Sequence, residues 1–391
     1  MTSSSLLNCT PLALAGYRMP PIGFGLWLDR EMDVSRVEHY LKALQPSHLD
    51  ILLDIAIPET RARLEAVMAL CAASAVSPWL YVICDDERPE PELRRLAGWL
   101  EKAKIVPAGM LVTPRAYLKS YQPDGAWPAG VSPEEVRALA RRHWPSIALG
   151  GGFPTCFTEL NRCRPDPSQI DFITHATSPL VHDAEDHGVM ESLESLAYIF
   201  QSARALAPGR PYKLTTSAIG AWTNPYGEQL TPNDGTRRVT LSDRDPRQRG
   251  LFGAAWQIGY VAHAAIAGVD TLTLSSLGPP FDIAGATPYP LFHVLRGLIR
   301  GGGQPLLTCS DAPARVATVG WQASDGTDGE LWLANLSSEP ASVSIKNVTV
   351  RALALLDAQA ALDDAQWMDR LQPARSLVAL PAFGVARLML E

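Results

Sequence analysis

The chain has 391 residues and a formal net charge of −7, with 47% hydrophobic and 19% charged residues. This composition is typical of a globular protein with one large domain and one small one. Because no basic block is present to neutralise phosphates, nucleic acid is excluded as a partner. No apolar run approaches the roughly 20 residues of a membrane span, so we expect no membrane insertion.

The first residues and the cysteines favour a mature, cytoplasmic chain. The opening stretch MTSSSLLNCTPLALAG resembles the apolar part of a signal peptide, but no Lys or Arg precedes it, and the first basic residue is Arg18. The cysteines are scattered, at Cys9, Cys71, Cys84, Cys156, Cys163 and Cys309. Scattered cysteines are typical of a reduced compartment, where a buried thiol acts as a small hydrophobic side chain. Without a C-x-x-C pair, they predict no zinc site.

From about residue 20, short apolar runs alternate with amphipathic helical patterns. Near-continuous apolar runs indicate strands buried on both faces. Helix starts carry capping residues before a proline, as in Ser132-Pro133 and Asp245-Pro246. An open doubly wound sheet is the alternative, but no G-x-G-x-x-G follows the first run. We therefore predict an α/β fold, a (β/α)8 TIM barrel over residues 21–302. Its strand runs are residues 20–28, 48–56, 78–86, 106–112, 146–153, 169–177, 212–220 and 269–277.

The pattern of residue types changes after residue 302. Short strand-like runs such as GELWLANLS and GVARLMLE are separated by turn residues such as SDGTDG. These runs predict a small all-β sandwich domain over residues 303–391. Residues 1–20 form a separate N-terminal segment, which could pair with the β domain.

One stretch, from residue 150 to residue 187, is crowded with groups that can give or take a proton. Chemistry in a barrel sits at the carboxyl ends of the strands, and Glu159 lies at or just past the end of the fifth run. A carboxyl group there can act as acid, base or nucleophile when burial tunes its pKa. Arg162 and Arg164 follow at spacings that could direct them toward Glu159 or toward a carboxylate ligand. The alternative is a structural Glu–Arg ion pair at the barrel mouth.

Two histidines follow in the same stretch. His175 ends the sixth run, and His182 lies on the next loop, where its imidazole suits general-base work near neutrality. Asp183, Glu185 or Asp186 could orient His182, although acidic residues also cap helix N-termini, and we favour capping for Asp186. A metal site made of His175, His182 and nearby acids is a weaker alternative, because no metal-ligand spacing is present.

The loop after the seventh run contributes Ser217, Trp222, Asn224 and Tyr226, the polar and aromatic types that hold sugars. No G-x-S-x-G motif occurs, which excludes an α/β-hydrolase nucleophile. A retaining glycosidase needs two carboxylates about 5 Å apart, and the seventh and eighth runs end without one. Candidates for a second carboxylate are Asp29, Asp54 and Asp282.

Several segments resemble the bacterial D-apionate lactonase family. They include GYRMPPIGFGLW, GGGFPTCFTELNRCRPD, DFITHATSPLVHDAEDHGVMESLESL and SAIGAWTNPYG. The resemblance implies a glycoside-hydrolase-like barrel with a β-sandwich, acting in apiose catabolism by hydrolysing apionolactone to apionate. Glu159, Asn161 and Arg162 fall on the family's E-L-N-R, and His182 with Asp186 on its V-H loop.

We therefore predict a lactonase. His182 would be the base for water and Glu159 the acid for the leaving oxygen, or the reverse, and Asn161 and Arg162 would bind the oxyanion or the product carboxylate. The expected partner is a small-molecule carbohydrate lactone, with no metal and no cofactor. Alternatives are a TIM-barrel glycoside hydrolase and a non-catalytic carbohydrate-binding relative. The remaining candidate substrate-binding residues are His175, Ser217 and Asn224.

Overall fold

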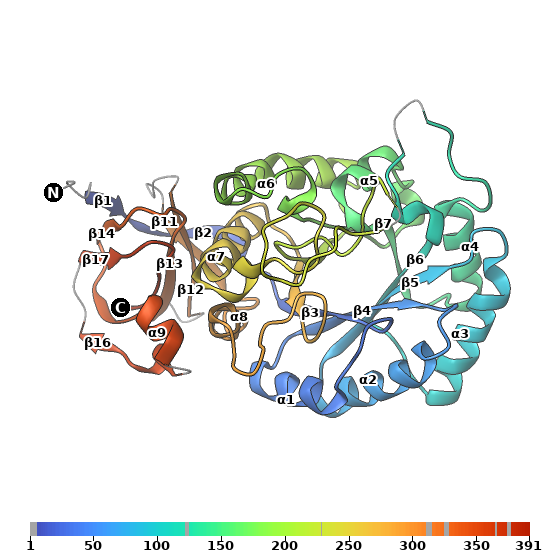
Figure 1. The fold of residues 1–391 in the computed structure, drawn as a ribbon, viewed down its shortest axis with the longest axis horizontal. Coiled ribbons are helices and arrows are strands. Elements are labelled where there is room, and N and C mark those ends of the chain that lie inside the picture. Colours follow the sequence, from blue (N-terminus) through green and yellow to red (C-terminus); the bar gives the residue numbers. More distant parts are fainter. Residues whose placement is uncertain are drawn as a thin grey trace.

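The computed structural model describes residues 6–121, 125–227, 229–309, 315–323, 328–363, 366–373 and 377–391. Residues 1–5 of the expected N-terminal segment therefore lie outside the described residues. The larger part is an α/β barrel, and the smaller part is a β domain that contains both the first described strand and the C-terminus (Figure 1).

Eight parallel strands close the barrel in the order β10-β3-β4-β5-β6-β7-β8-β9, which confirms the predicted TIM barrel. Each strand pairs with its neighbour in the sequence, and β10 closes the ring against β3. The strands are β3 (Ile22–Trp27), β4 (His48–Asp54), β5 (Ser77–Cys84), β6 (Gly109–Pro114), β7 (Ala148–Cys156), β8 (Phe172–Ala176), β9 (Tyr212–Ser217) and β10 (Thr271–Ser276).

Helices surround the barrel, and their starts follow the capping chemistry of the sequence. Ser132 and Glu135 form a reciprocal capping box at the start of α4. The short helix α5 (Phe157–Arg162), which carries Glu159, was not predicted from the sequence. The helix start predicted at Asp245-Pro246 forms the 3-10 helix η4 (Pro246–Arg249), which directly precedes α7. The other helices of the barrel are α1 (Val34–Leu44), α2 (Thr60–Ser74), α3 (Pro89–Ala103), α4 (Pro133–His143), α6 (Asp186–Leu206), α7 (Leu251–Ile266) and α8 (Pro290–Ile299).

The barrel interior holds a buried ion pair that the sequence analysis did not single out. Lys213 Nζ lies 3.0 Å from Asp50 Oδ1, and the hydroxyls of Thr215 and Thr273 donate to Asp50 Oδ2 at 2.8 and 2.7 Å. Burial lowers the pKa of Lys213, and the charge of Asp50 opposes this shift. The ammonium also lies 4.8 Å from the ring centre of Trp79.

An apolar layer separates this ion pair from the barrel mouth. Side chains alternate along a strand, so the next inward position after Asp50 on β4 is Leu52. Leu52 belongs to a buried cluster with Trp27, Tyr81 and Phe281. The ion pair is therefore part of the core, and the candidate chemistry must lie above this layer.

The β domain is a sandwich of two sheets, with strand orders β16-β15-β18-β13-β12-β11-β2 and β1-β14-β17. The N-terminal segment contributes one strand to each sheet, because β2 pairs with β11 and β1 pairs with β14. The strands are β1 (Leu6–Cys9), β2 (Pro11–Arg18), β11 (Pro305–Cys309), β12 (Val316–Gln322), β13 (Gly329–Asn335), β14 (Ala341–Ile345), β15 (Val350–Leu356), β16 (Gln372–Pro373), β17 (Leu377–Leu380) and β18 (Val385–Leu390), with helix α9 (Ala358–Asp363).

Cys9 and Cys309 form a disulfide between the two sheets, although they are separated by 300 positions in the sequence. The expectation of scattered reduced cysteines is wrong for these two residues. The expectation failed because β1 and β11 come together only in the folded sandwich. The spacing of cysteines along the sequence does not show which of them become neighbours in the fold.

The sandwich packs directly on the barrel. Trp332 of β13 is fully buried against Gly297 of α8, where a Cβ would stand 2.2 Å from the indole ring. Trp321 of β12 packs in the same way on Gly301. Because these glycines admit the two rings, the hydrophobic core runs continuously from barrel to sandwich.

No helix within the described ranges is long and apolar enough to cross a membrane.

Candidate functional site

A small pocket opens at the carboxyl ends of the barrel strands, where TIM barrels place their chemistry. Its walls come from the ends of β7 and β8 and from the loops that follow β9 and β10. The lining residues are Thr155, Cys156, Glu159, Ala176, Thr177, Ser178, Val181, Thr216, Gly220, Ala221, Trp222, Thr223, Pro225 and Phe281.

Glu159 is the titratable carboxyl of this pocket. Its side chain projects from α5, directly after β7, and the residue is only 4% exposed. Among the described residues, Glu159 Oε2 has no hydrogen-bond partner, and neither has the neighbouring Thr155 hydroxyl. Burial raises the pKa of Glu159, while the nearby hydroxyls of Ser120 and Thr155 partly oppose the rise. A buried carboxyl oxygen without a hydrogen-bond partner is costly for stability, so this geometry favours a functional role.

His182 lies at the rim, on the exposed loop between β8 and α6. Its Nε2 is 3.4 Å from the hydroxyl of Tyr226, and the two ring centres are 5.7 Å apart. Burial raises the pKa of Tyr226, and the charge of Glu159 adds to the rise while Arg162 opposes it. Tyr226 thus lies within electrostatic reach of Glu159 and in contact with His182, which places all three on one side of the mouth.

Arg162 and Asn161, the last two residues of the short helix α5, have different partners. The Arg162 guanidinium donates to the Ser120 hydroxyl, which in turn lies close to Glu159. The exposed Asn161 accepts from Arg164 through its amide oxygen at 2.8 Å and does not line the pocket. Arg162 can therefore position the acid through Ser120, whereas Asn161 organises the surface of the helix.

Three other candidate residues lie outside the pocket lining. His175 is fully buried on the outer face of β8, where its Nε2 and the Tyr212 hydroxyl are 2.6 Å apart. Ser217 faces α7 and accepts from the Tyr260 hydroxyl at 3.1 Å. Asn224 orders its own loop, accepting from the backbone N–H of Tyr226 at 2.9 Å. The structure does not bring these side chains to Glu159.

A bulge explains why Ser217 is turned away. Leu272 and Leu274 of β10 pair with Leu214 and Ser217 of β9, so β9 contains one extra residue between these partners. Strict alternation from the inward Lys213 would have pointed Ser217 into the barrel. Instead Thr216 lines the pocket.

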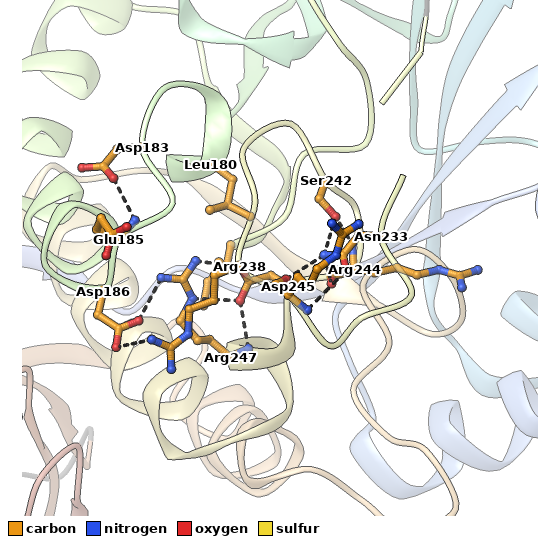
Figure 2. Close-up of polar contacts among 12 residues, drawn as sticks. Leu180, Asp183, Glu185, Asp186, Asn233, Arg238, Ser242, Arg244, Asp245 and Arg247 are labelled. Carbon is orange, nitrogen blue, oxygen red and sulfur yellow. Dashed lines mark hydrogen bonds and ion pairs between the residues drawn. The ribbon is translucent and has the colours of Figure 1, made fainter. Parts of the chain in front are cut away.

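The acids near His182 serve the fold of the loops (Figure 2). Asp183 accepts from the backbone N–H of Glu185 at 2.8 Å. Asp186 lies in the first turn of α6 and binds both Arg247 and Arg238, at 3.1 and 2.9 Å. Within the described chain no carboxylate contacts His182, so Tyr226 is the residue that can orient its ring.

Thr155 and Cys156 of the pocket wall were not predicted from the sequence. Both follow the apolar part of β7, and only the register of the strand shows that they face the mouth. Burial raises the pKa of Cys156 strongly, with the charge of Glu159 adding to the rise, so its thiol stays protonated.

Within the part of the chain that the structure describes, the pocket lining contains one carboxylate, that of Glu159. Asp54 binds Arg115 at 2.5 and 2.7 Å, and Asp282 forms an ion pair with Arg36 at 3.7 Å. Neither carboxylate lines the pocket around Glu159. No group of three or more described His, Cys, Asp or Glu residues could hold a metal ion.

The barrel, its pocket and the attached sandwich define a TIM-barrel protein with an additional all-β domain, a class with many solved members. An arabinofuranosidase superposes with a TM-score of 0.64 at 10% identity, covering 99% of this chain and 100% of that one. A GH30 endoxylanase from Clostridium papyrosolvens C71 gives a TM-score of 0.60 at 9% identity, covering 98% and 99%. At such identities the likeness establishes the fold alone.

Sequence comparison identifies the family within this class. Residues 22–303 match the D-apionate lactonase TIM barrel domain, and residues 313–388 match the D-apionate lactonase C-terminal immunoglobulin-like domain. The chain belongs to the D-apionate lactonase family, which confirms the resemblance. A D-apionate lactonase from Brucella anthropi is 33% identical over 290 residues, covering 72% of this chain and 46% of the relative. The chain thus spans about half the length of the curated relative it matches.

Proposed function

We propose that this protein hydrolyses a sugar lactone of the apionolactone type to the open-chain acid. The observation that carries the proposal is the buried Glu159 carboxyl, which lines the barrel mouth with Oε2 unpaired among the described residues. Membership of the D-apionate lactonase family supplies the substrate class.

Glu159 acts as the general acid. Opening a lactone ring releases an alkoxide, which needs a proton at the moment the ring C–O bond breaks. Because burial raises the pKa of Glu159, the carboxyl keeps its proton closer to neutrality than an exposed glutamate does. Arg162 supports this role indirectly, by holding the Ser120 hydroxyl beside the acid.

His182 acts as the base. It accepts a proton from water while the water oxygen bonds to the lactone carbonyl carbon, and the resulting oxyanion takes a hydrogen bond from the otherwise unpaired Thr155 hydroxyl. The ring C–O bond then breaks and its oxygen takes the proton of Glu159. The product is a hydroxy acid, and exchange with solvent restores both side chains. Tyr226 orients the His182 ring.

Two other chemistries fit the pocket less well. The thiol of Cys156 is not activated, because burial raises its pKa. Glycoside cleavage requires a second carboxylate near the first, and Glu159 is the only carboxylate among the described lining residues.

The test follows ring opening of D-apionolactone by proton release in weak buffer, after subtraction of the spontaneous rate. We expect Glu159→Gln and His182→Ala each to lower kcat by roughly 100- to 10,000-fold, the usual contribution of an acid–base residue. Matched controls are Glu101→Gln on α3 and His187→Ala, both exposed. Near-normal turnover by folded Glu159→Gln would refute the assignment of the acid. Absence of turnover by the unaltered protein on a panel of sugar lactones would refute the proposed function.

A further inference from the structure

A second groove lies on the far side of α5 from Glu159, between the start of α4 and the loop after β6. Its walls combine aromatic rings with guanidinium groups: Tyr117, Trp127 and Phe153 supply the rings, and Arg137, Arg162 and Arg164 supply the charge. Glu159 does not line this groove. Of the residues that line this groove, the proposed lactonase mechanism uses only Arg162, which supports the acid through Ser120.

Arg137 is the unusual member of this set. It is only 7% exposed, yet its guanidinium has no hydrogen bond or ion pair with any described residue. Arg164, by comparison, binds Asn161 at 2.8 Å. Burial lowers the pKa of Arg137, against the charges of Glu134 and Asp166. The Arg137 side chain is largely buried, but its guanidinium faces the groove and has no partner there among the described residues. An anion bound in the groove would supply that partner through charge-assisted hydrogen bonds.

The aromatic residues form a platform beside this charge. The rings of Tyr117 and Phe153 are stacked at 6.2 Å with an interplanar angle of 1°, and Trp127 stacks on Tyr117 at 5.9 Å and 16°. Trp127 is 49% exposed, so part of its surface is open to the solvent. A half-exposed indole stacked on a second aromatic ring suits the apolar face of a sugar ring.

We propose that this groove binds a sugar acid, with its carboxylate on the fork of Arg137 and its ring against Trp127. A carboxylate matches the two parallel N–H groups of a guanidinium. The exposed carboxylate of Glu134 also lines the groove, which favours a singly charged ligand over a doubly charged phosphate. This site is separate from the Glu159 pocket and does not depend on the proposed lactonase activity.

The test is isothermal titration calorimetry of the full chain with sodium D-glucuronate, D-glucose and D-glucose 6-phosphate. We expect glucuronate to bind, glucose to bind at least tenfold more weakly, and glucose 6-phosphate to bind no better than glucuronate. Arg137→Met should weaken glucuronate binding by roughly 10- to 100-fold, the effect of losing charge-assisted hydrogen bonds. Arg142→Met is the matched control, because Arg142 lies on the same helix with a 69% exposed side chain, outside the groove.

Two further variants keep the test decisive. Trp127→Ala alters a half-exposed side chain and should also weaken glucuronate binding, even if Arg137→Met does not fold. Glu159→Gln should leave glucuronate binding unchanged. Absence of glucuronate binding, equal losses in Arg137→Met and Arg142→Met, or tighter binding of the phosphate would each overturn the proposal.

Discussion

Glu159 combines two properties that compete at the level of a single residue. Its burial suits an acid that must hold a proton, but the same burial makes the ionised carboxylate expensive. The folded state binds the proton more tightly than the unfolded state, so the stability that the carboxyl provides falls as the pH rises from 4.5 through the raised pKa.

Glu159→Gln should therefore stabilise the protein at alkaline pH while it abolishes most of the activity. At alkaline pH, above the raised pKa, the wild-type carboxylate is charged and buried, and the neutral amide removes that cost. Below pH 4 both residues are neutral, and the two proteins should unfold at the same denaturant concentration. Urea titrations at the two pH values measure this difference, and a variant that is less stable than wild type at alkaline pH would show that Glu159 is a structural carboxylate.

His175 should make the fold sensitive to acid. Burial lowers its pKa from 6.5 to about 4, so the unfolded state binds the proton more readily and stability is lost as the pH falls through this window. A shift of this size corresponds to about 3 kcal/mol at pH 4 and below. His175→Gln should flatten the dependence of the free energy of unfolding on pH between 6.5 and 4. His187→Gln, a change at an exposed histidine, should leave the dependence intact.

At the scale of elements, the long loop between β9 and α7 shapes the pocket, because it supplies Gly220, Trp222 and Thr223. Its far end is fastened by Arg247, which binds the buried Asp245 at 2.7 Å and Asp186 of α6 at 3.1 Å. Figure 2 shows this anchor beside the loop that follows β8. One buried arginine thus ties together the two loops that carry His182 and the pocket wall.

Arg247→Met should destabilise the protein by about 3–5 kcal/mol, because it leaves Asp245 buried without its partner. Arg238→Met is the matched control. Its side chain is 54% exposed and binds the same Asp186, so its loss should cost less than about 1 kcal/mol. Equal losses in the two variants, measured by urea unfolding, would contradict the anchoring role of Arg247.

At the scale of the whole molecule, the two N-terminal strands belong to the same sandwich as the C-terminal strands. β1 and β2 precede the barrel in the sequence but pair with strands that follow it. The Cys9–Cys309 bond links these two parts of the chain covalently. A crosslink over such a long loop restricts the unfolded chain strongly.

Alkylation of the denatured, unreduced protein should modify four thiols, those of Cys71, Cys84, Cys156 and Cys163, and six after reduction. Replacing Cys9 and Cys309 together by Ala should lower the free energy of unfolding by up to about 5 kcal/mol, the chain-entropy value for a long loop. Six reactive thiols before reduction, counted by intact mass, would show that the bond is absent.

The sequence by itself determined the architecture and indicated Glu159 as a candidate for the site. Eight apolar runs alternating with amphipathic helices predicted the barrel, because each buried strand must be covered by a helix. The placement of Glu159 just after the fifth run was enough to select it, since barrel chemistry gathers at strand ends.

Only the tertiary structure decided which neighbouring side chains join Glu159. On β8, pleating turns His175 outward to Tyr212, and on β9 a bulge turns Ser217 to α7 while Thr216 reaches the pocket. A shift of one residue in the register of a strand moves each side chain to the opposite face. The sequence does not show which face a side chain takes, because apolar runs that are buried on both sides have no polar–apolar alternation. The Cys9–Cys309 bond was not predicted for a related reason, because contacts between distant segments form only on folding.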